Sequence, residues 1–291
     1  MTSGTASGGP TPPKSTASNP PRWPRSDVLL SQAARPAPLP GLAARLFLVA
    51  VIATAGLVAF LGVRPYQPWI LWLTAFLIAL ATDGTVRSHR HFEPAARFAI
   101  VPYVLLPAMA VLGAGYFAEE AFDGYARTAA GVIGGIAVAA VVFGEYHTVD
   151  YGSRLYGFMR LVLAIATYLV AFALYTIIFT RDTELALAGF LVGAVSFALS
   201  VELLRESRLL GSSSLLVGLA IGVSMAELRL VLYYFPLDGL LAGALLIIGF
   251  YLATGLVHHL LDHDLELGTM AEYLLVAGVG TAAVVITRVF V

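Results

Sequence analysis

Apolar runs follow one another from residue 42 to the end of the chain, with short polar stretches between them. A helix needs about 20 residues to cross the hydrocarbon core of a bilayer. The runs close to this length lie at 42–62, 68–83, 97–118, 128–148, 156–179, 185–204, 212–235, 237–259 and 270–290. They lack the alternation of a membrane β-barrel, and lipid leaves no partner for an open backbone. The pattern predicts an all-α, polytopic transmembrane helical bundle of nine spans. Eight is the alternative, because the second run is short and the polar stretch after the eighth can be re-entrant.

Composition agrees with a membrane protein. The chain is 59% hydrophobic and 12% charged, whereas soluble domains carry about 25% charged residues. A net charge of −1 and the lack of a basic patch exclude nucleic acid as the expected partner. Cysteine is absent, which rules out disulfides, iron–sulfur clusters and thiol catalysis.

The first forty residues differ from the rest. They hold nine of the fifteen prolines, with Ser, Thr, Gly and Ala between them. Such a segment cannot bury enough apolar surface to offset its ordering entropy. It is not typical of a cleaved secretory signal, because the first apolar run comes late and is too long. We expect a disordered, Pro/Ser-rich cytoplasmic tail over 1–40 and a transmembrane helical domain over 41–291.

Basic residues predict the orientation. With the N-terminus inside, twelve of them fall on the cytoplasmic side: Lys14, Arg22, Arg25, Arg35, Arg45, Arg87, Arg90, Arg97, Arg154, Arg160, Arg205 and Arg208. The outer side or the outer half-helices receive the other five: Arg64, Arg127, Arg181, Arg229 and Arg288. Cytoplasmic loops are enriched in Lys and Arg. We therefore expect a bacterial plasma-membrane protein with a cytoplasmic N-terminus and an external C-terminus.

Small residues recur four positions apart within the spans. The pairs are Gly131/Gly135, Gly189/Gly193, Gly218/Gly222 and Gly239/Gly243. Small faces let helix backbones approach closely in lipid. The main interpretation is helix packing; glycine hinges in moving helices are the alternative.

A polar cluster over residues 258–266 is the first candidate for chemistry. On a continued helix, His258/Asp262 and His259/His263 are i,i+4 pairs, and the histidine pair has metal-ligand spacing. Imidazole and carboxylate ligands suit Zn, Mn or Fe. Glu145, His147 and Asp150, at and just after the end of the fourth span, lie on the same predicted side of the membrane and are candidates to complete a metal or proton site. His147 and Asp150 share a helix face, whereas Glu145 points elsewhere. The alternative is that polar residues at helix ends are simply hydrated.

Glu227 is the second candidate, because it lies about 18 Å into the seventh span. A carboxylate at that depth costs about 2.5 kcal/mol or more unless it is protonated, paired or hydrated. Arg229 is two positions on and so points elsewhere on the helix. Together they form a buried ionisable site for proton coupling or cation binding; a structural bond to a neighbouring span is the alternative.

Three short segments resemble a known family. They are Gly144–Asp150 with Arg154 and Arg160, Ala226–Leu228 through Tyr234–Leu237, and Phe250–Leu256. Together they are similar to uncharacterised bacterial multi-pass membrane proteins, a domain of unknown function, over roughly residues 45–290. The resemblance implies a membrane helical fold and supplies no activity, substrate or ligand.

Three functional interpretations follow. The first is transport of a small solute or ion with a membrane-buried carboxylate. The second is a membrane-embedded, metal-dependent enzyme with a cytoplasmic-face His/Asp site, and the third is a non-catalytic scaffold or assembly subunit. Catalysis ranks behind transport, because no nucleophile elbow, phosphate loop or dinucleotide fingerprint is present. The expected surroundings are the lipid bilayer, and a homo-oligomer or a membrane-protein partner is left open.

Overall fold

The computed structural model describes residues 40–90, 100–181, 183–206, 212–261 and 267–290. Nine α-helices lie in these ranges: α2 (Pro40–Gly62), α3 (Pro68–Arg87), α4 (Val101–Ala121), α5 (Gly124–His147), α6 (Tyr156–Thr180), α7 (Leu185–Leu203), α8 (Ser212–Leu232), α9 (Gly239–Leu261) and α10 (Leu267–Phe290). A 3-10 turn, η1 (Leu204–Glu206), follows α7. The predicted tail falls on residues 1–39, which lie outside the described residues.

All nine helices are long and apolar enough to cross a membrane. The prediction of an all-α bundle with nine spans is therefore confirmed for the described residues. The alternative of eight spans is not supported. One boundary was wrong, because α3 continues to Arg87 beyond the predicted end at residue 83. Polar residues extend this helix without exposing the backbone: Thr82 and Thr85 donate to the carbonyls four residues earlier, at 2.8 and 2.7 Å.

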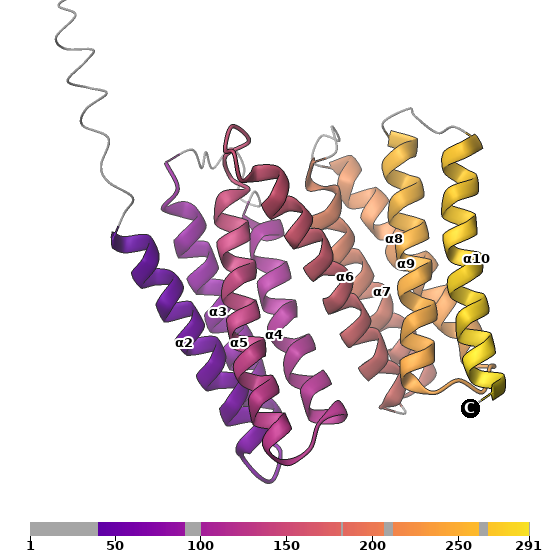
Figure 1. The fold of residues 1–291 in the computed structure, drawn as a ribbon, viewed down its shortest axis with the longest axis horizontal. Coiled ribbons are helices and arrows are strands. Elements are labelled where there is room, and N and C mark those ends of the chain that lie inside the picture. Colours follow the sequence, from indigo (N-terminus) through magenta and orange to yellow (C-terminus); the bar gives the residue numbers. More distant parts are fainter. Residues whose placement is uncertain (1–39, 91–99, 182, 207–211, 262–266, 291) are drawn as a thin grey trace, which may run out of the picture. The chain divides into compact units, whose positions relative to one another are not determined.

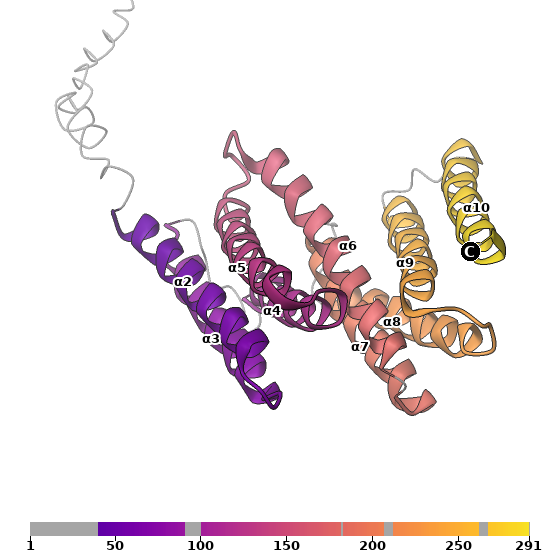
Figure 2. The ribbon, with the colours of Figure 1, turned by 60° about the horizontal axis from the view of Figure 1, so that its bottom comes forward.

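Helix α6 lies in the middle of the helical domain. It packs against α4 and α5 on one side and against α7 and α9 on the other. Helices α2 to α5 contact one another, α8 packs on α7 and α9, and α10 packs on α9 (Figures 1 and 2). Consecutive helices run in opposite directions, so α5, α7 and α9 end at the face where α6, α8 and α10 begin. We call this side of the bundle the network face, because a network of four charged side chains lies near it. It is uppermost in Figure 1.

Glycine pairs mark the closest helix contacts, as predicted. A Cβ on Gly222 would lie 2.7 Å from the backbone oxygen of Gly193, which brings α8 against α7. A Cβ on Gly135 would lie 2.6 Å from the Thr54 backbone of α2. On α9, Gly243 faces Thr176 of α6. The interpretation of these residues as packing surfaces is confirmed.

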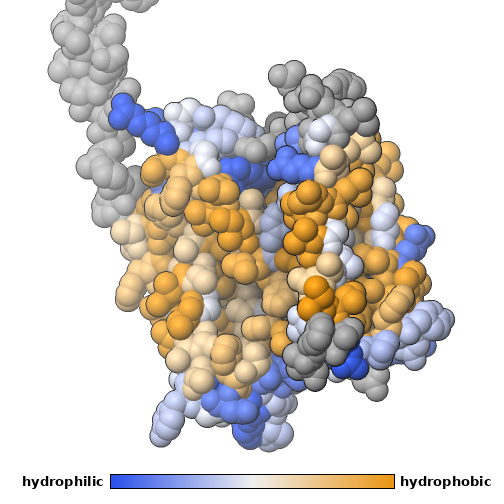
Figure 3. Space-filling model, turned by 45° about the vertical axis from the view of Figure 1, so that its right-hand side comes forward, coloured by the Kyte–Doolittle hydropathy of each residue, from blue (hydrophilic) through white to orange (hydrophobic). Residues whose placement is uncertain are grey.

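The outer surface is that of a membrane protein. Large apolar side chains such as Phe47, Trp72 and Phe190 are more than half exposed. In Figure 3 an orange apolar band covers the middle of the helices, and blue polar residues gather at both ends. Water cannot solvate such a band favourably, and lipid can. The chain is a multi-pass membrane protein.

Candidate functional site

Four charged side chains meet inside the bundle near the network face. Glu145 ends α5, Arg160 begins α6, Glu202 ends α7 and Arg205 lies in η1. Both glutamates are completely buried, and the arginine side chains are 11–12% exposed. We call these four residues the charge network. Buried charges persist only when they are paired and hydrogen-bonded.

Arg160 binds the C-terminal end of α7 through hydrogen bonds. Its Nη1 donates to Glu202 Oε1 at 2.8 Å. Its Nη2 donates to the carbonyls of Glu202 and Leu203, at 3.0 and 2.8 Å. The last carbonyls of a helix have no partner within the helix. Arg160 therefore satisfies both the carboxylate and the open end of the helix that carries it.

Arg205 joins the two glutamates. Its Nη1 donates to Glu145 Oε2 at 2.8 Å and to Glu202 Oε2 at 3.1 Å. Its Nη2 donates to Thr148 Oγ1 at 2.9 Å, and its Cζ lies 4.1 Å from the centre of the Tyr103 ring of α4. Burial opposes the charged guanidinium, but the attraction of Glu145 and Glu202 outweighs it and raises the pKa of Arg205 above its ordinary value. Arg205 therefore stays charged.

Helix polarity explains why arginines are needed here. Glu145 and Glu202 stand at helix C-termini, where the helix dipole disfavours negative charge. Two arginines from other elements balance the two carboxylates. The network is therefore neutral when all four groups are ionised.

One atom of the network has no partner. Glu145 Oε1 is buried and accepts no hydrogen bond from any described residue. A buried acceptor left open costs about 1–3 kcal/mol, and more when it is charged. Glu145 Oε1 is thus a position where a proton or a water molecule would relieve an unfavourable contact.

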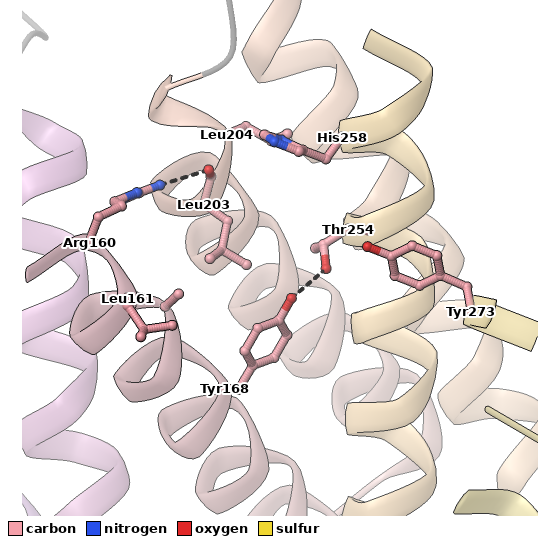
Figure 4. Close-up of a pocket in the computed structure, with 10 residues that line it drawn as sticks. Arg160, Leu161, Tyr168, Leu203, Leu204, Thr254, His258 and Tyr273 are labelled. Atoms are coloured by element: carbon pink, nitrogen blue, oxygen red, sulfur yellow. Dashed lines mark hydrogen bonds between the residues drawn. The ribbon is translucent and has the colours of Figure 1, made fainter. Parts of the chain in front are cut away.

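A cavity of about 260 Å³ adjoins the network. It is lined by Arg160, Leu161, Ala164, Tyr168, Leu203, Leu204, Thr254, Gly255, His258 and Tyr273. Figure 4 shows Arg160 and His258 at one end of it and the Tyr168–Thr254 hydrogen bond, 3.0 Å long, at the other. Arg160 and Tyr168 are separated by about 12 Å along α6. Polar groups therefore extend from the network face into the membrane-spanning part of the bundle.

The predicted histidine site is not assembled from α5 and α9. His147 Nδ1 lies 3.0 Å from the carbonyl of Phe143, one turn back on α5. Asp150 accepts from the Gly152 N–H at 3.0 Å in the following turn. His258 and His259 are on the last turn of α9, and α6 lies between α5 and α9. The structure therefore does not bring His147 and Asp150 together with the α9 pair.

A metal centre stays a prediction. Among the described residues, three or more His, Asp or Glu side chains do not converge as a metal site. Asp262 and His263, which complete the predicted i,i+4 pairs, lie outside the described residues. Glu145, the third residue predicted from the fourth span, belongs to the charge network.

Glu227 and Arg229 point in different directions on α8. Met225 and Arg229, four residues apart, are both buried at 2% and 4% exposure. Glu227 lies between them on the opposite side of the helix, so its side chain is exposed on the outer surface of the bundle. Its depth along the span is as predicted, but neighbouring helices do not enclose it. Arg229 packs its guanidinium 4.2 Å from the centre of the Phe179 ring.

Sequence reasoning did not predict three of the four residues of the charge network as site residues. Arg160 and Arg205 counted as signs of orientation, Arg160 also belonged to the family resemblance, and Glu202 was not singled out. The signal was present, because Glu202 ends an apolar span and Arg205 follows it at i+3. The cavity hydroxyls of Tyr168, Thr254 and Tyr273 carried no comparable signal, since such residues are common in membrane helices.

Comparison with known proteins identifies the family alone. The model of the family described as "Protein of unknown function (DUF5656)" matches residues 47–287. The chain belongs to this family, and the resemblance to a domain of unknown function is confirmed. No curated protein and no solved structure matches the chain.

Proposed function

We propose that this chain, a member of a family whose function is unknown, is a transporter that couples a small solute to a proton carried by Glu145. The observation that carries the proposal is the unpartnered Oε1 of a fully buried carboxylate. A buried carboxylate with one oxygen left without a donor is poorly solvated in its ionised form, so a proton on that oxygen would remove an unfavourable contact. Protonation adds one H⁺ to the carboxylate and gives the neutral acid.

A continuous path links this proton to the cavity. Glu145 binds Arg205 at 2.8 Å, Arg205 binds Glu202 at 3.1 Å, and Glu202 binds Arg160 at 2.8 Å. Arg160 lines the cavity. When Glu145 is neutral, Glu202 is the one ionised partner that Arg205 keeps among the described residues. Glu202 then takes a different position in the two protonation states, and Arg160 moves with it. Coupling between the proton and a solute in the cavity requires such a difference in contacts between the two states.

Infrared pH titration of the purified protein tests the proton. We expect a carbonyl stretch of a protonated carboxylic acid that disappears in Glu145→Gln and persists in Glu227→Gln. Glu227 is the matched control, because it is a second carboxylate within a span but lies on the outer surface. Persistence of the band in Glu145→Gln would exclude Glu145 as the proton carrier.

Proteoliposomes that contain a pH-sensitive dye test transport. A panel of carboxylates, amino acids, sugars and inorganic anions is added at matched pH, and solute-driven proton entry is followed. We expect entry with at least one solute, its loss in Glu145→Gln and a reduced rate in Glu145→Asp, which keeps a titratable group. Equal signals from protein-free vesicles, or an unchanged rate in Glu145→Gln, would overturn the proposal. If Glu227→Gln alone abolishes the flux, the coupling group is the one on α8.

A further inference from the structure

The charge balance of the network limits what the neighbouring cavity can bind. Arg160 and Arg205 are balanced by Glu145 and Glu202. The groups that face Glu145 are Glu202 of α7, Arg205 of η1, Arg160 of α6 and, through Arg205, Tyr103 of α4. An anion beside Arg160 would leave one uncompensated negative charge in a medium of low dielectric constant. A proton on Glu145 removes that charge, so anion binding and protonation favour each other.

The lining of the cavity favours an acceptor-rich ligand. Three hydroxyl groups, a guanidinium and an imidazole face it, from Tyr168, Thr254, Tyr273, Arg160 and His258. Among the described residues that line it, none carries a carboxylate that would attract a cation. Thr254 donates to the Phe250 carbonyl at 2.7 Å, and Tyr168 bonds Thr254 at 3.0 Å, so the Arg160 guanidinium is the group that would attract carboxylate oxygens most strongly.

Its size and its walls favour a short, partly apolar molecule. A volume of about 260 Å³ lies below the usual range for drug-sized ligands and corresponds to roughly nine water-sized groups. Figure 4 shows Leu161 and Leu203 near Arg160, and Ala164 also lines the cavity. A chain of a few carbon atoms can lie against these side chains while its charged end faces the donors.

We infer that this cavity is the binding site for a small monocarboxylate, taken up together with one proton. The inference rests on the proposed function, because it names the solute class of the same proton-coupled site. The carboxylate lies toward Arg160 and His258, and the aliphatic part lies along Leu161 and Ala164. The pair of charges that enters, one anion and one proton, leaves the buried network neutral.

Equilibrium dialysis of radiolabelled butyrate against the full-length protein in detergent tests the site without any transport step. We expect saturable binding of one butyrate per chain that weakens by up to about tenfold per pH unit above neutrality. Butyrate itself stays ionised from about pH 6 upward, so the decline would report a protein group. Butyramide, its neutral isostere, should not compete at tenfold excess.

Matched variants locate the site. Ala164→Leu adds bulk to the cavity wall one helical turn from Arg160 without changing a charge, and it should abolish binding. Ala220→Leu makes the same change on the exposed surface of α8 and should leave binding intact. Tyr168→Phe should weaken it several-fold by removing a hydroxyl.

Three outcomes would overturn the inference: equal competition by butyramide, binding that does not change with pH, or displacement by inorganic phosphate and lipid phosphate in preference to butyrate. Butyrate binding without any proton flux would uphold the site and refute the transporter. Proton flux driven by another solute, without butyrate binding, would uphold the transporter and refute the monocarboxylate site.

Discussion

Arg205 donates to Glu145 at 2.8 Å across a separation of sixty residues in the sequence. The bond links η1 to the last turn of α5. It is one of three buried ion pairs that draw α5, α6 and α7 together at the network face. The stability of this end of the bundle should therefore depend on it.

Arg205→Gln should lower the free energy of unfolding by about 3 kcal/mol, because it leaves two buried carboxylates without their shared cation. Chemical denaturation in detergent measures the loss. A double-mutant cycle with Glu145→Gln should give a coupling energy of about 1 kcal/mol or more. Arg87→Gln is the control: its partner Asp83 is on the same helix and both side chains are exposed by a third or more, so about 1 kcal/mol or less is expected. Equal losses from the two arginines would contradict the special role of Arg205.

Tyr125→Cys and Tyr151→Cys should react with a membrane-impermeant thiol reagent from opposite sides of the membrane. Tyr125 lies in the first turn of α5 and Tyr151 lies just after its end, and they are 97% and 68% exposed. Because the natural chain has no cysteine, each variant carries a single reactive thiol. Positive-inside bias predicts that Tyr151→Cys is labelled from the cytoplasm and Tyr125→Cys from outside. Labelling of both from one side would show that α5 does not cross, and the reverse pattern would invert the predicted orientation.

Gly222→Val should destabilise the bundle by about 1–3 kcal/mol, since an added side chain meets the Gly193 backbone and neither helix can yield cheaply. Gly278→Val is the matched control, because a Cβ there has open space around it, and a change within about 0.5 kcal/mol is expected. Thermal unfolding of both variants in one detergent makes the comparison. Similar melting temperatures would show that the α7–α8 contact is looser than the structure has it.

The spans could be predicted from the sequence because one physical constraint, the thickness of the bilayer, fixes the length of every apolar run. The glycine pairs could also be interpreted from the sequence, because a spacing of four residues within one helix is enough to predict a small packing face. Helix order in space could not be derived, because nearly every face of these helices is apolar and any pair can pack. The pairing of Glu145 with Arg205 therefore stayed hidden, although both residues were visible at helix ends.

The two candidate carboxylates show the same limit. Depth along a helix can be counted, and it singled out Glu227. The direction of its side chain depends on which neighbours α8 has, and the burial of Met225 and Arg229 turns Glu227 outward. Glu145 was near a helix end and was considered for a metal or proton site, with hydration as the alternative, whereas Glu202 and Arg205 from later in the chain enclose it.

Arg229→Met should raise the free energy of unfolding by about 1 kcal/mol or more. The side chain is 4% exposed, and its Nε and Nη1 have no partner among the described residues. Each unsatisfied buried donor costs about 1–3 kcal/mol, whereas the contact with the Phe179 ring returns about 0.5–2 kcal/mol. Methionine keeps the apolar stem and removes the desolvated charge.

Arg205→Met is the matched control for the direction of the stability change. The same substitution at a guanidinium with three hydrogen bonds to neighbouring side chains should destabilise the protein. Denaturation of both variants under one condition decides between them. If Arg229→Met is instead destabilising to the same degree, the guanidinium has an anionic partner in the membrane. That partner would belong to the bilayer or to a second protein, because the described residues of this chain provide none for its Nε and Nη1.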